Sequence, residues 1–232
     1  MKKIFIFFIV CLVLFSCSNY SISTVSIGIQ GSGNKEQVWM IKNLDVTTYR
    51  DGTVIPEVSD PTEWSKLTTG AWCYYKNDPA IGEVYGKLYN WYAVNDPRGL
   101  APEGFHIPSN DEWSALTDYL SIESVGYSIG DRLDEGGTPG LKMKEAGNTH
   151  WARDNEDATN SSGFTGLPGG IRSEDGKFRS IGIEGNWWSS TEKDLSIYYN
   201  SAWQWSLSCN SWGVDKYYYK KGFGLSVRCI KD

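Results

Sequence analysis

Residues 86–120 read GKLYNWYAVNDPRGLAPEGFHIPSNDEWSALTDYL, and this stretch carries the strongest helix signal in the chain. Ser109 and Glu112 have the spacing of a capping box, in which the hydroxyl and the carboxylate accept hydrogen bonds from backbone N–H groups that a first helical turn leaves unpaired. Apolar side chains then recur at helical spacing, which predicts a helix with one buried face. They are Trp113, Leu116 and Leu120.

A shorter helix is expected upstream in the same stretch. Its aromatic and apolar residues are Tyr89, Trp91, Tyr92 and Val94. We expect it to end before Asp96, because the sequence DPRG at 96–99 is a turn signal. The segment 102–108 joins the two helices and has a proline at each end, so it should be a rigid connector.

Short strands are expected in the rest of the chain. Residues 71–75 (AWCYY) are apolar and β-prone, which predicts an inner strand. Three more strands are predicted at 198–207, 214–219 and 223–230. In the first of them, Trp203, Trp205 and Leu207 alternate with polar residues, as in a half-buried strand.

Four separate motifs together resemble one protein family. They are the stretch 86–120, LPGGIR at 167–172, WWSSTE at 187–192 and GFGLSVRCIKD at 222–232. Their order resembles the Fibrobacter succinogenes major paralogous domain over residues 36–232, and more distantly the formylglycine-generating enzyme superfamily. The resemblance implies a C-type-lectin-like α+β fold with two helices, short antiparallel sheets and much ordered loop. It also implies a secreted or lipid-anchored bacterial protein.

The N-terminus has the pattern of an export signal. Lys2 and Lys3 precede the apolar run 4–15, which is too short for a comfortable membrane span and is typical of a secretory signal. Ser16 precedes Cys17 as in a bacterial lipobox, so we expect residues 1–16 to be removed and Cys17 to be lipidated. An ordinary signal peptide with an incidental cysteine is the alternative. Residues 17–35 would then tether the domain to a bacterial membrane, with the outer membrane favoured and the leaflet left open.

The charge balance argues against a nucleic-acid partner. The formal net charge is −6, and loss of residues 1–16 would make it −8, because two lysines and no acidic residue would leave. Nucleic-acid binding demands clustered Lys or Arg. The densest basic group, Lys216, Lys220 and Lys221, is interrupted by tyrosines and favours a solvated strand edge.

Three cysteines remain if Cys11 leaves with the signal and Cys17 is lipidated. They are Cys73, Cys209 and Cys229. An odd number outside the cytoplasm permits at most one disulfide, and three pairings are possible. The pairing of Cys209 with Cys229 is favoured, because both are placed on strands that a connecting strand can bring together.

No cofactor or metal site is expected. In the formylglycine-generating enzymes copper is held by two cysteines shortly before the terminal GF-x-x-x-R segment, and here only Cys209 lies in that interval. The chain has only two histidines, His106 and His150, and both are interpreted as packed, hydrogen-bonded side chains. A calcium site made of loop carboxylates such as Asp154, Glu156 and Asp157 is the alternative that remains open.

The abundance of aromatic residues favours a binding role. The chain has 11 tryptophans and 14 tyrosines, which suit surfaces that bind sugars or proteins. Trp212 is the preferred ligand-contacting residue because a turn cannot easily bury it. Gln204, Asn210, Asp215 and Trp187 are predicted to assist it. Further candidates, each weighed against a core position, are Trp188, Trp203, Trp205 and 217–219.

The sequence therefore predicts a non-catalytic binding module for carbohydrate or for a cell-surface protein. A structural subunit of a surface complex or appendage is the alternative. An enzyme such as a glycosidase is less favoured, since no nucleophile elbow, zinc motif or phosphate loop is present and Asp111 and Glu112 are explained by helix capping.

Overall fold

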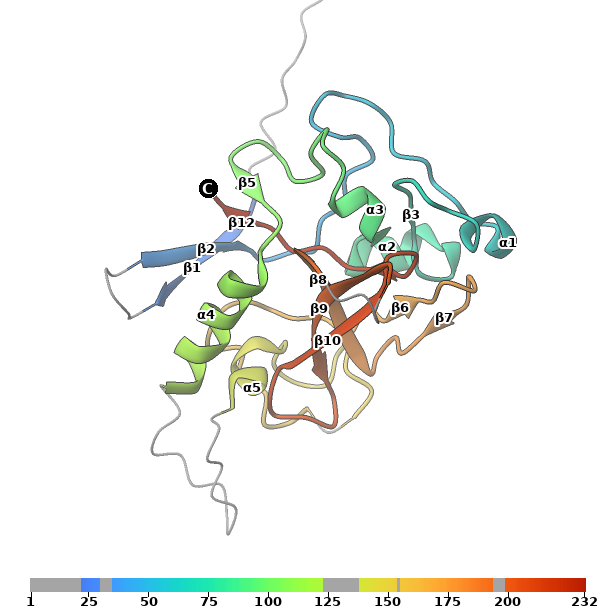
Figure 1. The fold of residues 1–232 in the computed structure, drawn as a ribbon. Coiled ribbons are helices and arrows are strands. Elements are labelled where there is room, and N and C mark those ends of the chain that lie inside the picture. The colour runs from blue at the N-terminus through green and yellow to red at the C-terminus, as the bar shows by residue number, and fades with distance from the viewer. Residues whose placement is uncertain (1–21, 30–34, 123–137, 154, 194–198) are drawn as a thin grey trace, which may run out of the picture.

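A computed structural model describes residues 22–29, 35–122, 138–153, 155–193 and 199–232. Within these ranges the chain forms three small sheets, and every pair of named strands is antiparallel. Five α-helices lie around and between the sheets (Figure 1). This combination confirms the α+β prediction.

The first sheet brings both ends of the described chain together. Its strand order is β1-β2-β12-β5. The strands are β1 (Thr24–Ile29), β2 (Lys35–Met40), β12 (Ile230–Lys231) and β5 (Phe105–His106). Ile230 lies opposite both Trp39 and His106 in this sheet. Residues 24–29 of the segment predicted to be a tether therefore belong to the folded domain.

The other two sheets have five and three strands. The five-stranded sheet has the order β3-β4-β11-β6-β7, with β3 (Trp72–Cys73), β4 (Leu88–Asn90), β11 (Gly224–Leu225), β6 (Ile171–Arg172) and β7 (Phe178–Arg179). The three-stranded sheet has the order β10-β9-β8, with β10 (Asp215–Lys220), β9 (Ser201–Ser208) and β8 (Glu184–Glu192). In this sheet β10 is an edge strand.

The longest helix, α4 (Asn110–Ile122), begins as predicted. Ser109 Oγ accepts a hydrogen bond from the Glu112 backbone nitrogen at 3.3 Å, and the Glu112 carboxylate accepts one from the Ser109 nitrogen at 2.8 Å. Trp113, Leu116 and Leu120 are all buried. The helix contacts both β1 and β8, so its apolar face closes the space between two sheets (Figure 1).

The fold has more helices than the two that were expected. The predicted shorter helix is α3 (Trp91–Val94). The additional helices are α1 (Pro61–Trp64), α2 (Pro79–Tyr85) and α5 (Pro139–Met143), and a 3-10 turn spans Tyr75–Asn77. All three additional helices start with a proline, and Asp60 and Asp78 cap two of them. Asp-Pro pairs start turns as well as helices, so the sequence pattern at 60–61 and 78–79 does not by itself indicate a helix.

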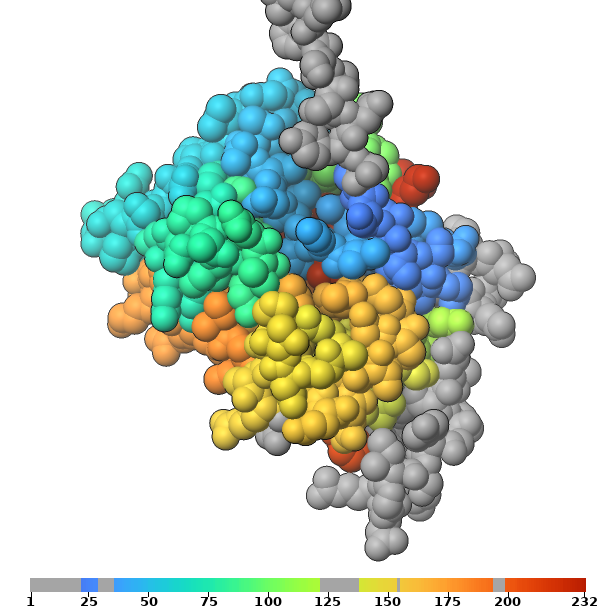
Figure 2. All heavy atoms as spheres, turned by 180° about the vertical axis from the view of Figure 1, so that it is seen from behind, coloured from blue at the N-terminus to red at the C-terminus, as the bar shows by residue number. Residues whose placement is uncertain are grey.

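The buried apolar residues form three clusters, and the one under α4 is the richest in tryptophan. Trp113 lies 4.8 Å from Trp39 and 6.0 Å from Trp205, measured between ring centroids. Seen from behind, the segment from α5 to residue 170 covers the lower part of the surface below the β1–β2 hairpin (Figure 2). These contacts join helix, hairpin and three-stranded sheet into one core.

Candidate binding surface

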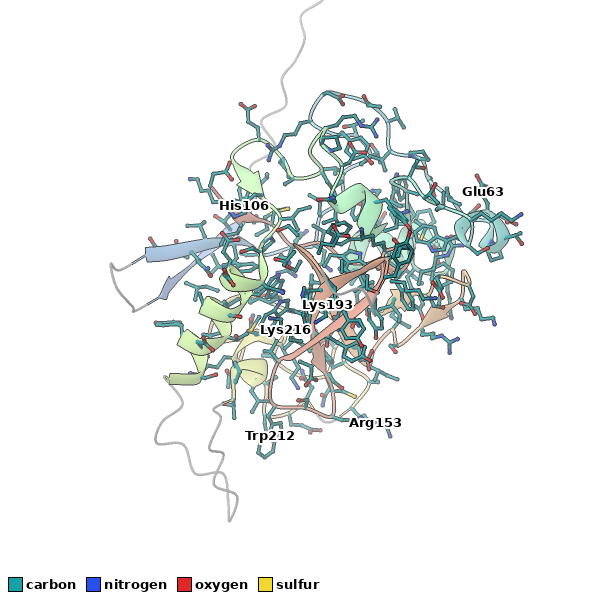
Figure 3. The ribbon with its side chains drawn as sticks, viewed as in Figure 1. Glu63, His106, Arg153, Lys193, Trp212 and Lys216 are labelled. Atoms are coloured by element: carbon teal, nitrogen blue, oxygen red, sulfur yellow. The ribbon has the colours of Figure 1, made fainter. Side chains whose placement is uncertain are left out.

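The turn end of the β9–β10 hairpin carries three of the predicted ligand-contacting residues. Trp212 is partly exposed, and Asn210 and Asp215 are exposed. Figure 3 shows the Trp212 side chain at the far end of the hairpin, pointing away from the body of the protein. The backbone of this loop is held against α5, because the carbonyls of Trp212 and Gly213 pack closely against Gly140. The predicted site is therefore a projecting loop tip. Among the described residues, no other aromatic ring forms a ring pair with Trp212.

Two other predicted ligand-contacting residues are buried, which corrects their assignment. Trp187 is 1% exposed, and its indole nitrogen donates to Asn43 Oδ1 at 2.8 Å. Gln204 is 2% exposed and lies opposite Trp188 in the sheet. Both side chains face core clusters on either side of the three-stranded sheet, so neither can contact a ligand.

A different part of the same sheet exposes aromatic rings beside lysines. Trp203 of β9 lies directly opposite Tyr218 of β10, and their rings meet edge to face with centroids 6.0 Å apart. Lys193, just after β8, and Lys216 of β10 lie over the same face of the sheet (Figure 3). We call Trp203, Tyr218, Lys193 and Lys216 the Trp203 surface.

Both lysines of the Trp203 surface contact the indole ring. Lys193 Nζ lies 3.7 Å from the Trp203 ring centroid, and Lys216 Nζ lies 4.7 Å from it. Lys193 Nζ also lies 5.4 Å from the Tyr218 ring. Cation–π contacts of this kind contribute about 0.5–1 kcal/mol each at exposed positions. The contacts hold two positive charges next to one partly exposed aromatic ring.

The aromatic contacts continue around the edge strand. Tyr217 lies on the opposite face of β10 and is 52% exposed, yet its ring stacks on Tyr218 with a centroid distance of 4.7 Å. Tyr217 also contacts Tyr219, which stacks on Phe223 at 4.6 Å. Tyr217, Tyr218, Tyr219 and Phe223 therefore form a continuous series of ring contacts that begins at the Trp203 surface.

The position of α4 explains why Trp203 is accessible. Trp203 and Trp205 share one face of β9 because side chains two residues apart point the same way. Trp205 is covered by Trp113 of α4, whose ring stacks on it at 14°. Trp203 lies two residues before Trp205 on the same face of β9, outside the part of the strand that Trp113 covers. Sequence reasoning included Trp203 among the alternatives to Trp212 but missed the two lysines, because it interpreted Lys216 as a solvated charge.

A cleft of about 540 Å³ lies elsewhere, between the segments 46–50 and 100–103. The side chain of Arg50 lines it, but its guanidinium donates to the backbone carbonyls of Ala101 at 2.6 Å and Pro102 at 3.2 Å. These bonds brace the connector between α3 and α4. The arginine in this cleft is already hydrogen-bonded to backbone carbonyls of the protein. The Trp203 surface is therefore the stronger candidate for ligand binding.

The predicted disulfide is not formed. Cys73, Cys209 and Cys229 are all buried and all free. Cys209 belongs to the cluster under α4, whereas Cys229 belongs to the cluster on the other side of β9, which explains why strand order alone did not bring them together. Burial raises the pKa of Cys73 and of Cys229 to about 12, so both thiols are held protonated.

Both histidines are hydrogen-bonded to carboxylates. His106 Nδ1 lies 2.8 Å from Asp232 Oδ1, and His106 Nε2 lies 2.7 Å from Glu112 Oε1. His150 Nδ1 lies 2.8 Å from Glu145 Oε1. This confirms that both are hydrogen-bonded, and both side chains are partly exposed. In the described part of the chain, no three His, Cys, Asp or Glu side chains gather in a metal-binding arrangement.

Several predictions fall outside what the structure describes. Residues 1–16, Cys17 and Asp154 are not among the described residues. In the described ranges, no helix combines the length and apolar character that crossing a membrane requires.

Comparison with known proteins identifies a family. The chain finds no match among curated proteins or among solved structures. A model of the Fibrobacter succinogenes major domain matches residues 34–231, which include all of the described sheet strands after β1. The match covers most of the 232 residues and agrees with the motifs at 86–120, 167–172, 187–192 and 222–232. The chain belongs to the Fibrobacter succinogenes major domain family.

Proposed function

We propose that this protein is a non-catalytic binding module with a C-type-lectin-like fold that recognises carbohydrate through the Trp203 surface. In this proposal it is exported, lipidated at Cys17 and anchored in the bacterial cell envelope, with the outer membrane favoured. The observation that carries it is the contact of Trp203 with Tyr218 at 6.0 Å beside two lysines. No cofactor and no nucleic-acid partner is assigned.

The chemistry of these side chains suits a sugar. Aromatic rings offer apolar faces to the C–H groups of a pyranose, while their polar tips and the lysine ammonium groups can bond to hydroxyl oxygens. Tyr217 adds an exposed ring next to Tyr218. The Trp203 and Tyr218 rings and the two lysines come from three strands or strand ends of one sheet. Little conformational freedom is therefore lost when a ligand binds.

A protein partner is the second candidate, and the edge strand favours it. Among the strands of the described residues, β10 has a neighbour on one side alone, which leaves one row of its backbone N–H and C=O groups without a partner strand in its sheet. Such an edge can pair with a strand of another protein, as would occur in a subunit of a surface complex or appendage. Lys216 and Lys220 near the two ends of β10 oppose unspecific pairing, which makes this candidate the weaker one.

A glycan array tests the proposal with soluble protein that starts at residue 18. The Trp203→Ala variant should bind at least about tenfold more weakly than the unmodified protein, as expected for a central aromatic contact. Trp212→Ala is the matched control, because Trp212 lies on the same hairpin away from the surface. Loss of binding in Trp212→Ala alone would move the site to the loop tip. Absence of binding to every glycan would favour the protein partner.

A further inference from the structure

We infer that the sugar stacks on the ring of Tyr217, that Asp215 and Ser206 bind its hydroxyl groups, and that the preferred ligands are neutral glycans. This inference rests on the proposed function and specifies its stacking ring and its ligand class. It follows from the placing of these three side chains on one face of β9 and β10, at the edge of the sheet that adjoins the Trp203 surface.

Tyr217 offers an aromatic ring to solvent. The residue is 52% exposed, and its ring stacks on that of Tyr218 at an angle of 11°, with a centroid distance of 4.7 Å. Because Tyr218 covers one face of the ring, the exposed surface belongs to the other face and to the ring edges. Trp203 supports this arrangement, since it contacts Tyr218 edge to face at 6.0 Å.

Two polar side chains share the face of the sheet from which Tyr217 projects. Asp215 precedes Tyr217 by two residues in β10, so both side chains point to the same side of the strand. Ser206 of β9 lies directly opposite Asp215 and therefore shares that side. Asp215 is exposed and Ser206 is partly exposed. In the described ranges neither side chain forms a salt bridge or a side-chain hydrogen bond within the protein, so their oxygens are available to a ligand.

These groups match the chemistry of a pyranose. Two adjacent hydroxyl groups can donate to the two oxygens of the Asp215 carboxylate, and the Ser206 hydroxyl can donate to or accept from a third. The C–H face of the same sugar can pack on the Tyr217 ring. Residues two apart in a strand are separated by about 7 Å, which is the scale of one sugar unit.

The charges around the site favour a neutral ligand. Asp215 repels the carboxylate of an acidic sugar, and the neighbouring exposed Lys216 repels the ammonium group of an amino sugar. Within the described residues Lys216 takes part in no salt bridge, unlike Lys220, which pairs with Glu174 at 2.7 Å. A hydroxyl group is repelled by neither charge, because it is neutral and can both donate and accept.

Three β-1,4-linked oligosaccharides of equal length test the ligand class: cello-oligosaccharides, their uronic acid forms oxidised at C6, and chitosan oligosaccharides. The corresponding neutral, uronic and amino sugars of the galactose series accompany them. We expect the neutral member to bind at least about threefold more tightly than either charged member. Asp215→Asn should strengthen binding of the uronic acid relative to the neutral sugar, and Lys216→Met should do so for the amino sugar. Glu83→Gln, which removes an exposed carboxylate on α2, is the control.

Substitution of the aromatic ring tests the stacking residue. Tyr217→Ala should weaken binding of the neutral glycan by at least about tenfold, whereas Tyr217→Phe, which keeps the ring, should retain it. Trp212→Ala is the matched control, because it removes a partly exposed aromatic ring from the turn end of the same hairpin. Circular dichroism of each variant establishes that the protein is folded, so that lost binding reports on the surface.

The outcomes separate the two proposals. Binding that is weakened in Trp203→Ala but unchanged in Tyr217→Ala and in Asp215→Asn would overturn the inference and leave the carbohydrate function in place. Equal affinity for neutral, uronic and amino sugars would overturn the ligand class. Absence of binding to every glycan would overturn both the inference and the carbohydrate function.

Discussion

Arg228 donates two hydrogen bonds to the side-chain oxygen of Asn43, from Nε at 3.1 Å and from Nη2 at 2.8 Å. The guanidinium is fully buried, and its remaining bonds go to the backbone carbonyls of Met40 at 3.1 Å and Phe164 at 2.6 Å. Burial lowers the pKa of Arg228 below its ordinary value. Among the described residues the hydrogen-bond acceptors of this charge are neutral oxygens, and they come from two distant parts of the chain, residues 40–43 and Phe164.

Asn43→Ala should destabilise the protein strongly. The substitution removes the shared acceptor of Arg228 and of the Trp187 indole nitrogen, leaving a buried charge and a buried N–H underbonded. We expect the free energy of unfolding to fall by about 3 kcal/mol or more. Urea denaturation measures it, with Asn95→Ala, an exposed asparagine, as the control. A loss below about 1 kcal/mol would show that the arginine finds other partners.

Asn43→Asp separates charge from hydrogen bonding at the same position. Aspartate would offer Arg228 a formal counter-charge, but it cannot donate. The Asn43 amide nitrogen donates to the Tyr85 carbonyl at 2.8 Å and to Ser226 Oγ at 3.2 Å. We therefore expect Asn43→Asp to be intermediate in stability between the unmodified protein and Asn43→Ala. Full stability in the same denaturation experiment would mean that the counter-charge offsets the loss of these two donated bonds.

His106 should make stability depend on pH. Burial alone would lower the pKa of His106, but bonds and charges from Glu112 and Asp232 outweigh it and raise the pKa. Its contribution is therefore present below the unfolded pKa and is lost as pH rises through the raised folded pKa. Burial would raise the pKa of Glu112, but the Ser109 and His106 bonds lower it, so its contribution is lost as pH falls through that lowered pKa.

The measurement is the unfolding free energy of the unmodified protein minus that of His106→Gln across pH. The difference should be largest between the lowered pKa of Glu112 and the raised pKa of His106, and it should amount to about 1 kcal/mol or less because the side chains are partly exposed. A difference that stays constant from acid to alkaline pH would show that the imidazole acts by packing alone.

Reducing agent should leave stability unchanged. Cys73, Cys209 and Cys229 are free, so reduction has no bond to break. Protein starting at residue 18 should release three reactive thiols on denaturation, and the native protein should react slowly because the cysteines are buried. A lower melting temperature in reducing agent, or fewer than three thiols, would reveal a disulfide.

Gly140→Ala should loosen the β9–β10 hairpin. An added Cβ would lie 2.2 Å from the Gly213 carbonyl oxygen and 2.6 Å from that of Trp212, and backbone atoms cannot turn aside. We expect a loss of about 1–3 kcal/mol, although alanine is the better helix former. Gly213→Ala is the matched control, because its nearest neighbour would be Ser211 Oγ at 3.7 Å. Equal thermal melting of the two variants would refute the close packing.

Local signals account for the elements that the sequence predicts correctly. The capping box of Ser109 and Glu112 and the spacing of Trp113 and Leu116 depend on residues within two helical turns, so α4 could be recognised. Alternation of Trp203, Trp205 and Leu207 likewise predicted a strand at 198–207, and β9 is Ser201–Ser208. Short helices such as α2 were missed because a capped proline starts a turn and a helix alike.

By itself the sequence determined the family, the α+β class, the main helix and the principal strands, because periodicity and capping act between near neighbours. Only the tertiary structure decided which tryptophans are exposed. Trp187 and Trp203 both lie on strands of the three-stranded sheet, yet Trp187 is buried against Trp113 of α4 and Trp203 is partly exposed. The separation of the cysteines and the placing of Lys193 and Lys216 against Trp203 were likewise decided by strand packing, because each depends on segments that meet only after the chain has folded.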